Sequence, residues 1–285
     1  FMGTVEAVAH ENGAVLQALP ASGVAVFPSD DAFTAVWQSL AGRRDQRTFS
    51  MAADAAFEPA DVRSAVVVWQ SGAWQFTLKT AQGTAPVHLH IAGRHNVKNA
   101  LAASACALAA GVPLAAVAQG LIAFEPVKGR SRALVLHTPG HDVTLVDDTY
   151  NANPDSVAAA IRVLAELPGP RCLVLGEMGE VGEQGLDFHL EVLHQAQATG
   201  LTNVHVSGQW MAQAVATLTL NAEAVPQLWC DVDELAAYIA GTVAQADGPQ
   251  SLLVKGSRFM RMERVVQAVM TRNTQNTQTE APHVA

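Results

Sequence analysis

A chain of 285 residues is long enough for two compact domains, because most domains contain about 100–200 residues. Its net charge of −9 argues against nucleic acid or an anionic membrane as the main partner, since both bind basic surfaces. The composition, 49% hydrophobic and 15% charged, is typical of a globular protein and not of a disordered chain. A small polar metabolite is therefore a better match as the partner.

The cysteines and the chain ends indicate where the protein works. Three cysteines without a C-x-x-C spacing predict neither a disulfide framework nor a zinc site, and they suit a reducing compartment. No apolar run reaches the roughly 18–20 residues that span a bilayer, and the N-terminus lacks the layout of a signal peptide. We therefore expect a cytoplasmic protein without membrane insertion. We also expect a monomer, although these features do not determine the oligomeric state. Because Phe1 is not an initiator methionine, we also expect that an upstream part has been removed.

The first half of the sequence predicts helices that pack with a small sheet. Apolar residues at helical spacing indicate helices, and alternating runs rich in β-branched residues indicate strands. The expected helices cover residues 4–19, 32–40, 96–110 and 112–124. The expected strands cover residues 24–27, 65–69, 74–78 and 87–91, of which the last three form hairpins. His88 and His90 fall on one face of the last strand, where exposure to solvent explains them better than metal binding.

The second half alternates strands with helices. After a hairpin at 132–137 and 142–147, expected strands at 143–147, 172–175, 204–207, 227–230 and 252–254 each lead into a helix. This alternation predicts an α/β fold with a parallel, doubly wound sheet, in which function lies in loops after the carboxyl ends of strands. We expect one domain at 1–129 and a second at 130–272. Residues 273–285 are polar and expected to be a disordered tail.

A polar stretch, G-R-H-N-V-K-N-A, begins the first long helix. Asn96 and Asn99 lie three residues apart and therefore on one face of the first turn. Their carboxamides offer donors and acceptors that can bind the edge of an adenine. The alternative is that Asn96 only caps the helix.

Two carboxylates end the first strand of the second half, in the stretch D-D-T-Y-N-A-N-P-D-S that begins at Asp147. Asp148 is placed to accept hydrogen bonds from ribose hydroxyls or to orient a cation. Asn153 precedes Pro154, a favoured first-turn residue, so for Asn153 alone a helix-capping role is favoured. For the two acids at a strand's carboxyl end, a functional role is favoured.

The loop after the next strand is acidic and rich in glycine. It contains Glu177, Glu180 and Glu183, with His189 nearby. The three carboxylates could bind a metal or a substrate ammonium and stay secondary candidates. Their spacing matches no standard metal loop, so a solvated acidic loop is the favoured interpretation and no metal ligand is assigned.

Basic residues occur at two informative places. Lys255-Gly256-Ser257-Arg258 follows the last strand, and its ammonium and guanidinium can dock a carboxylate or phosphate; a turn with two solvated cations is the alternative. Arg130 and Arg132 lie at the domain boundary, where an arginine can contact a nucleotide phosphate or pair with a surface acid.

Taken in order, these stretches resemble the Mur ligase family. The pattern H-N-x-x-N-x-x-A-A is similar to the family's adenine-side element, Gly129-Arg130 to its arginine at the start of the C-terminal domain, and Asp148 to its ribose-binding aspartate. The stretches D-x-Y-N-A-N-P-x-S, G-x-M-x-E-x-G and K-G-S-R resemble the member that adds D-alanyl-D-alanine to a UDP-linked muramoyl tripeptide. The resemblance covers nearly all of residues 1–272. It implies the remainder of a central ATPase domain followed by a Rossmann-like C-terminal domain.

The activity that the resemblance implies is an ATP-dependent amide ligation in peptidoglycan precursor synthesis. ATP would phosphorylate the tripeptide carboxylate of UDP-N-acetylmuramoyl-tripeptide, and the amine of D-alanyl-D-alanine would attack the acyl phosphate, with Mg²⁺ as a further cofactor. The implied nucleotide contacts are Asn96, Asn99, Arg130 and Asp148. The implied dipeptide contacts are Asn151, Asn153, Ser257 and Arg258, and the implied catalytic residues are Arg130 and Lys255.

The chain departs from the family pattern at the phosphate site. No G-x-x-x-x-G-K-[ST] occurs, and the family's Mg²⁺-binding glutamate and histidine are expected upstream of Phe1. Truncation explains both departures, and the chain alone is expected to be inactive. Two alternatives stay open: another amide ligase of the same fold, such as a different Mur ligase or a folylpolyglutamate synthase, and a non-catalytic nucleotide-binding module.

Overall fold

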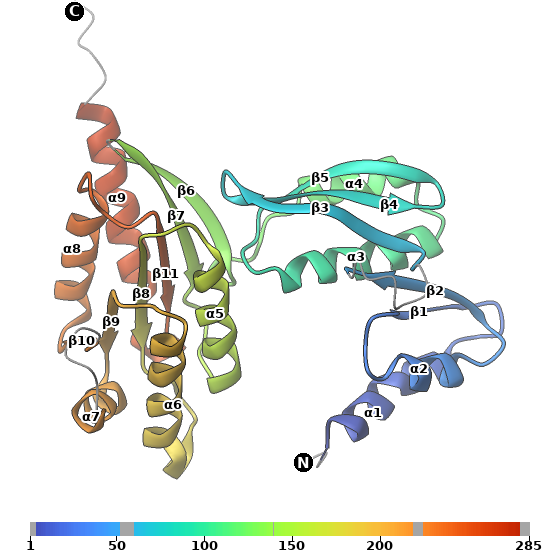
Figure 1. Cartoon of the computed structure of the whole chain (residues 1–285), viewed down its shortest axis with the longest axis horizontal. Helices are drawn as coiled ribbons and strands as arrows, with labels where there is room; N and C mark the ends of the chain where they lie inside the picture. Colours follow the sequence, from blue (N-terminus) through green and yellow to red (C-terminus); the bar gives the residue numbers. More distant parts are fainter. Residues whose placement is uncertain (1–3, 52–59, 139, 219–224, 280–285) are drawn as a thin grey trace, which may run out of the picture. The chain divides into compact units, whose positions relative to one another are not determined.

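The computed structural model describes residues 4–51, 60–138, 140–218 and 225–279. Its contacts divide the chain into two compact units, which we call unit 1 (residues 1–89 and 94–124) and unit 2 (residues 90–93 and 125–285) (Figure 1). The expected boundary between Gly129 and Arg130 lies inside unit 2. The backbone explains this placement, because the Gly129 N–H donates to Asp147 Oδ2 at 3.2 Å and so ties the linker to unit 2.

Unit 1 contains a mixed sheet with the strand order β1-β2-β3-β4-β5 among its described residues. Its strands are β1 (Val24–Pro28), β2 (Asp45–Ser50), β3 (Val62–Gln70), β4 (Ala73–Thr80) and β5 (Gly83–Leu89). The pairs β1–β2 and β2–β3 are parallel, whereas β3–β4 and β4–β5 are antiparallel. Its helices are α1 (Val5–Ala18), α2 (Thr34–Ala41), α3 (His95–Ala109) and α4 (Leu114–Ile122).

The strand β2 was not expected from the sequence. It reads D-Q-R-T-F-S, and only its last two residues are buried. Such a strand has no apolar run and no clear alternation, so its identity depends on backbone pairing with β1 and β3. The hairpins that were expected therefore belong to a larger sheet. His88 and His90 are exposed, as expected.

Unit 2 confirms the predicted strand–helix alternation. Its sheet has the order β10-β9-β8-β11-β7-β6 over the described part of the chain, and only β6 runs antiparallel to its neighbour there. The strands are β6 (Arg132–Thr138), β7 (His141–Asp148), β8 (Arg171–Gly176), β9 (Val204–Ser207), β10 (Gln227–Trp229) and β11 (Ser251–Lys255). The helices are α5 (Pro154–Glu166), α6 (Gly185–Ala198), α7 (Gln209–Thr217), α8 (Val232–Val243) and α9 (Glu263–Thr279).

Helices cover both faces of this sheet (Figure 1). Leu252 and Val254 of β11 join Val143 and Leu145 of β7 in one core with α8 and α9. Because side chains alternate along a strand, the residues between them point toward α5 on the opposite face. The doubly wound architecture expected from the sequence is therefore present.

The C-terminal tail differs from expectation. The helix α9 continues to Thr279, so residues 273–279 are helical where a disordered tail was expected. Extending a helix that is already packed costs less than starting one, and neither glycine nor proline interrupts this stretch. Residues 280–285 lie outside the described residues. Across the described residues, we find no helix with the length and apolarity needed to cross a membrane.

A buried histidine lies at the β10 side of the sheet. His205 Nδ1 accepts a hydrogen bond from Trp229 Nε1 at 3.1 Å, and His205 Nε2 lies 2.9 Å from Asn203 Oδ1. Since the indole can only donate, the imidazole is neutral and carries its proton on Nε2. Burial lowers the pKa of His205 to about 4.

Acid should therefore destabilise the fold through His205. Between its ordinary pKa of 6.5 and the folded value of about 4, the unfolded chain binds the proton more readily, so the free energy of unfolding falls as pH falls. The loss amounts to at most about 3 kcal/mol. Urea unfolding at a series of pH values should show a shallower decline for His205→Gln than for the wild type. The same substitution at exposed His88 is the control, and equal slopes for both variants would contradict the prediction.

Candidate functional site

The carboxyl ends of three neighbouring parallel strands bring predicted site residues together in unit 2. Lys255, the last residue of β11, is the register partner of Asp148 in β7 and of Leu175 in β8. Residues at one register position of neighbouring strands point to the same face. The sheet therefore places the Lys255 and Asp148 side chains next to each other.

Lys255 and Asp148 form an ion pair in which Lys255 is buried and Asp148 is partly buried. Lys255 Nζ lies 2.6 Å from Asp148 Oδ2 and donates a second hydrogen bond to the Asn151 carbonyl oxygen at 2.9 Å. The exposed fractions of the two side chains are 3% for Lys255 and 16% for Asp148. Asp148 Oδ1 also accepts from the N–H and the hydroxyl of Ser131, at 2.9 and 3.2 Å. Ser131 was not predicted as a site residue from the sequence, although it directly follows Arg130.

The neighbouring carboxylate, Asp147, holds the loop and linker. Its Oδ1 accepts from the Thr149 hydroxyl at 2.6 Å, and its Oδ2 accepts from the Gly129 N–H. The Tyr150 N–H donates back to the Gly129 carbonyl oxygen at 3.0 Å. Gly129 has φ of +78°, and an added Cβ would lie 2.9 Å from the Tyr150 nitrogen, so this close approach requires glycine.

Arg130 is exposed, whereas its neighbours Gly129 and Ser131 are held by hydrogen bonds to Asp147 and Asp148. Its guanidinium carbon lies 4.3 Å from the centre of the Tyr150 ring, a cation–π arrangement. Tyr150 is half-exposed, so both groups face solvent while the backbone on either side is fixed. Arg130 was predicted from the sequence as a site residue, whereas the aromatic ring that it contacts was not.

The two predicted asparagines of the following loop have local roles. Asn153 is the N-cap of α5, and it forms a capping box with Ser156. The helix-capping interpretation of Asn153 is therefore confirmed. Asn151 Oδ1 accepts from the Ala152 N–H at 2.9 Å, and both asparagines are exposed.

In the K-G-S-R segment, Lys255, Gly256 and Ser257 are buried, whereas Arg258 is exposed. The Ser257 hydroxyl and N–H both donate to the Glu177 carbonyl oxygen, which joins the end of β11 to the loop after β8. Gly256 packs against Gly176. Arg258 is 69% exposed and lies 3.4 Å from Glu263, so its guanidinium is the accessible cation of this segment.

The acidic loop after β8 is anchored at its start. Glu177 Oε2 accepts from the Trp210 N–H at 3.0 Å. His189 Nε2 accepts from the Met178 N–H at 2.9 Å, and its Nδ1 lies 2.6 Å from the Gly185 carbonyl oxygen. Burial lowers the pKa of His189 despite that contact with Gly185. Both ring nitrogens are thus used within the loop, which leaves no lone pair for a metal.

In unit 1, Asn96 and Asn99 lie together in the first turn of α3, where Asn99 Nδ2 donates to Asn96 Oδ1 at 3.1 Å. The helix begins at His95 with Arg94 at the N-cap position, so the interpretation of Asn96 as the N-cap is wrong. Between them, Lys98 forms an ion pair with Asp30 at 2.8 Å. Burial raises the pKa of Asp30, but hydrogen bonds from Lys98 and Ser50 outweigh this effect and leave it lowered.

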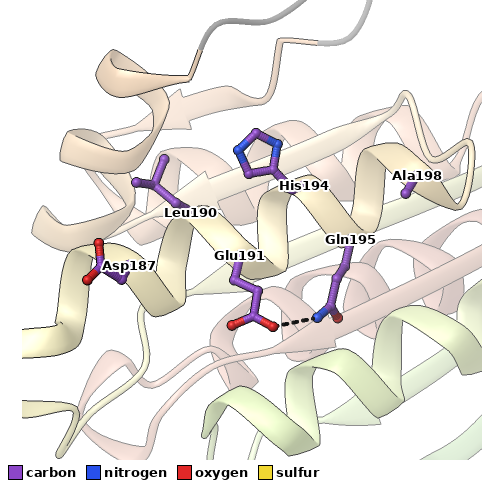
Figure 2. Close-up of a pocket in the computed structure, with 6 residues that line it drawn as sticks. All are labelled: Asp187, Leu190, Glu191, His194, Gln195 and Ala198. Atoms are coloured by element: carbon purple, nitrogen blue, oxygen red, sulfur yellow. Dashed lines mark hydrogen bonds between the residues drawn. The ribbon is translucent and has the colours of Figure 1, made fainter.

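A surface hollow elsewhere in unit 2 contains none of the predicted site residues. Figure 2 shows the residues that line it, all from one side of α6: Asp187, Leu190, Glu191, His194, Gln195 and Ala198. Its internal hydrogen bond joins Gln195 to Glu191 at 3.2 Å. Among the residues that the structure describes, no group of three or more histidine, cysteine or acidic side chains is placed to hold a metal ion.

Comparison with known proteins identifies the family. The Mur ligase middle domain matches residues 1–107, and the Mur ligase glutamate ligase domain matches residues 131–258. The chain belongs to the Mur ligase family.

Its relatives carry a more specific name, UDP-N-acetylmuramoyl-tripeptide–D-alanyl-D-alanine ligase. The one from Escherichia coli (strain K12) is 35% identical over 273 residues, covering 95% of this chain and 57% of that protein. The one from Haemophilus influenzae is 34% identical, covering 93% and 55%. A crystal structure of MurF from Acinetobacter baumannii is similar with a TM-score of 0.72 and 29% identity, covering 95% and 56%. The chain thus spans about half the length of the relatives it matches.

Close packing at Gly256 yields a stability prediction. An added Cβ would lie 2.5 Å from Met262 Cγ and 3.1 Å from the Gly176 backbone, so Gly256→Ala should lower the free energy of unfolding by about 1–3 kcal/mol. The control is Gly241→Ala in α8, where an added Cβ meets nothing within 4 Å and should stabilise by about 0.5–1 kcal/mol. Urea midpoints measure both. Equal midpoints for the Gly256 variant and the wild type would show that the strand ends are not tightly packed.

Proposed function

We propose that this chain is the later part of an ATP-dependent ligase that joins D-alanyl-D-alanine to UDP-N-acetylmuramoyl-tripeptide through an acyl phosphate, in peptidoglycan precursor synthesis. Membership of the Mur ligase family and the names of the relatives support the proposal. The structural observation that carries it is the group formed by Asp148, Lys255 and the Asn151 loop at the carboxyl ends of β7 and β11. Ligands of doubly wound sheets bind at such strand ends.

On this proposal, each unit carries its own candidate nucleotide contacts. Asn96 and Asn99 offer carboxamide donors and acceptors for the adenine edge. Asp148 accepts a hydrogen bond from a ribose hydroxyl, and Arg130 donates hydrogen bonds to a phosphate oxygen. Four acceptor positions are available on a carboxylate, and three on Asp148 are filled by Ser131 and Lys255. The carboxylate is therefore oriented and retains capacity for one further donor.

The dipeptide would bind beside the nucleotide at the loops of unit 2. Arg258 is the accessible guanidinium of the K-G-S-R segment and can form paired hydrogen bonds with a carboxylate such as that of D-alanyl-D-alanine. Asn151 and Asn153 present exposed carboxamides from the loop that precedes α5. Ser257 supports Arg258 from a buried position through Glu177. Lys255 supplies the positive charge beneath this loop.

The reaction requires an amine to attack an activated carboxyl carbon. Transfer of the terminal phosphoryl group of ATP to the tripeptide carboxylate gives an acyl phosphate. The dipeptide amine adds to its carbonyl, and the tetrahedral intermediate releases phosphate and forms the amide. Arg130 would stabilise negative charge on the phosphate, while the loops of unit 2 hold the amine in place, which lowers the entropic cost of the attack.

The Mg²⁺ that the family implies does not fit the residues described here, which contain no cluster of three ligands. The chain also contains no phosphate loop sequence. The proposal therefore assigns both to the upstream part of a full-length protein, and no step above depends on metal ligands in this chain.

A prediction about the chain by itself follows. With purified ATP, tripeptide substrate and dipeptide, these 285 residues should form no measurable amide, since nothing in the sequence cradles the β- and γ-phosphates. Phosphate release and product mass are the measurements. The full-length protein assayed in parallel should form the amide. Turnover by the shorter chain would contradict the division of labour proposed here.

Arg258 provides a direct test of the dipeptide site. In the full-length protein, Arg258→Ala should raise the KM for D-alanyl-D-alanine about 10- to 100-fold, because a hydrogen bond to a charged group contributes about 1.5–3 kcal/mol. The KM for ATP should change little. Arg264→Ala, which removes a partly exposed arginine paired with Asp233, is the control. An unchanged dipeptide KM and kcat in the Arg258 variant would remove Arg258 from the site.

A further inference from the structure

The ammonium of Lys255 is too enclosed to serve as an ordinary substrate contact. Its side chain is 3% exposed, whereas that of Arg258, three residues later, is 69% exposed. A buried charge is stable only when it is paired and hydrogen-bonded, and Lys255 has both kinds of partner. Turning toward a substrate would break the ion pair with Asp148.

The two partners of Lys255 belong to different halves of the proposed site. Asp148 is on the nucleotide side, whereas the Asn151 carbonyl oxygen belongs to the loop on the dipeptide side. We propose that Lys255 is a positioning residue that holds the Asp148 carboxylate and the Asn151 loop in one fixed arrangement. This inference rests on the proposed function and deepens it, because it gives one buried cation a role in both substrate sites.

The chemistry of the contacts fits a lysine. An ammonium donates in three directions, so it can bond to a carboxylate and to a carbonyl oxygen that lie at an angle to each other. The planar guanidinium of an arginine is larger and donates in one plane. The backbone of Lys255 is also held in place, since Lys255 is the last residue of the fully buried strand β11. The site therefore selects for a small, tetrahedral cation.

Two variants separate the contact of Lys255 with Asp148 from its contact with the Asn151 carbonyl oxygen. Asp148→Asn removes the counter-charge of Lys255 but keeps a side-chain oxygen at position 148, so the ammonium still has that acceptor and the Asn151 carbonyl oxygen. The variant should unfold at a lower urea midpoint than the wild type, so exchange in the two variants is compared under conditions in which the β9 amides stay protected in both. The double variant Asp148→Asn/Lys255→Met removes the contact with the Asn151 carbonyl oxygen as well, without leaving a partly buried carboxylate unpaired, so it is expected to fold. Comparing the double variant with the single one isolates the effect of the hydrogen bond from Lys255 to the Asn151 carbonyl oxygen.

Hydrogen exchange on the 285-residue chain tests the holding role directly. The amides of residues 150–153 should exchange at least about tenfold faster in the double variant than in Asp148→Asn, because the loop loses a charge-assisted hydrogen bond. The amides of β9 should be unchanged and report that unit 2 remains folded. Arg264→Met, at an exposed ion pair of the same unit, is the control and should leave both regions unchanged. Equal loop exchange in the single and double variants would overturn the proposal.

Kinetics of the full-length protein provide the readout that a purely structural role would not move. Asp148→Asn should raise the KM for ATP and leave the KM for D-alanyl-D-alanine near the wild-type value. Adding Lys255→Met should raise the dipeptide KM about tenfold with kcat nearly unchanged. A large fall in kcat with an unchanged dipeptide KM would instead show a cation that contacts the reacting groups, and would overturn the positioning role. Wild-type protein without ligase activity would overturn the proposed function, while the exchange experiment would still decide whether Lys255 holds the loop.

Discussion

The ion pair between Lys255 and Asp148 is the interaction on which the rest of the candidate site depends. It follows from strand register, because the last residues of β7 and β11 are partners in a parallel pair and so point to the same face. Burial makes the pairing necessary for Lys255, since its charge is not stable alone in a low-dielectric interior. Once the pair is formed, the hydrogen bond to Asn151 and those from Ser131 determine where the two adjoining loops run.

The K-G-S-R segment shows why a sequence pattern gives the place of a site but not the role of each residue. Its four residues suggest several donors gathered for a ligand, and the position after the last strand was predicted correctly. In the structure, Lys255 and Ser257 donate to other strand ends, and Arg258 is the cation that faces solvent. Which side chain is buried depends on neighbouring strands more than 75 residues earlier in the chain, and local sequence carries no record of that contact.

Elements whose signal lies in the local sequence were predicted, whereas those that depend on distant partners were not. The apolar strands of unit 2 are buried on both faces, so they appear as continuous runs between helices and were identified with nearly correct limits. The polar strand β2 was not predicted, because it is defined by backbone hydrogen bonds to its neighbours and its side chains show no strand pattern. The end of α9 was placed too early, because polar residues without glycine or proline are compatible with either a tail or a helix. Local chemistry was predictable, as at Asn153, when both partners of an interaction lie within one turn.

Two adjacent aspartates at the end of β7 hold different residues of the linker. Asp147 and Asp148 point to opposite faces of the strand, yet both bond to the linker, one to Gly129 and the other to Ser131. Arg130 lies between these two anchored residues with its guanidinium over Tyr150. An exposed arginine ordinarily loses much side-chain and backbone entropy when it binds an anion. Here the backbone part of that loss has already occurred on folding, so Arg130 combines the accessibility of a surface residue with the preorganisation that a phosphate-binding group requires.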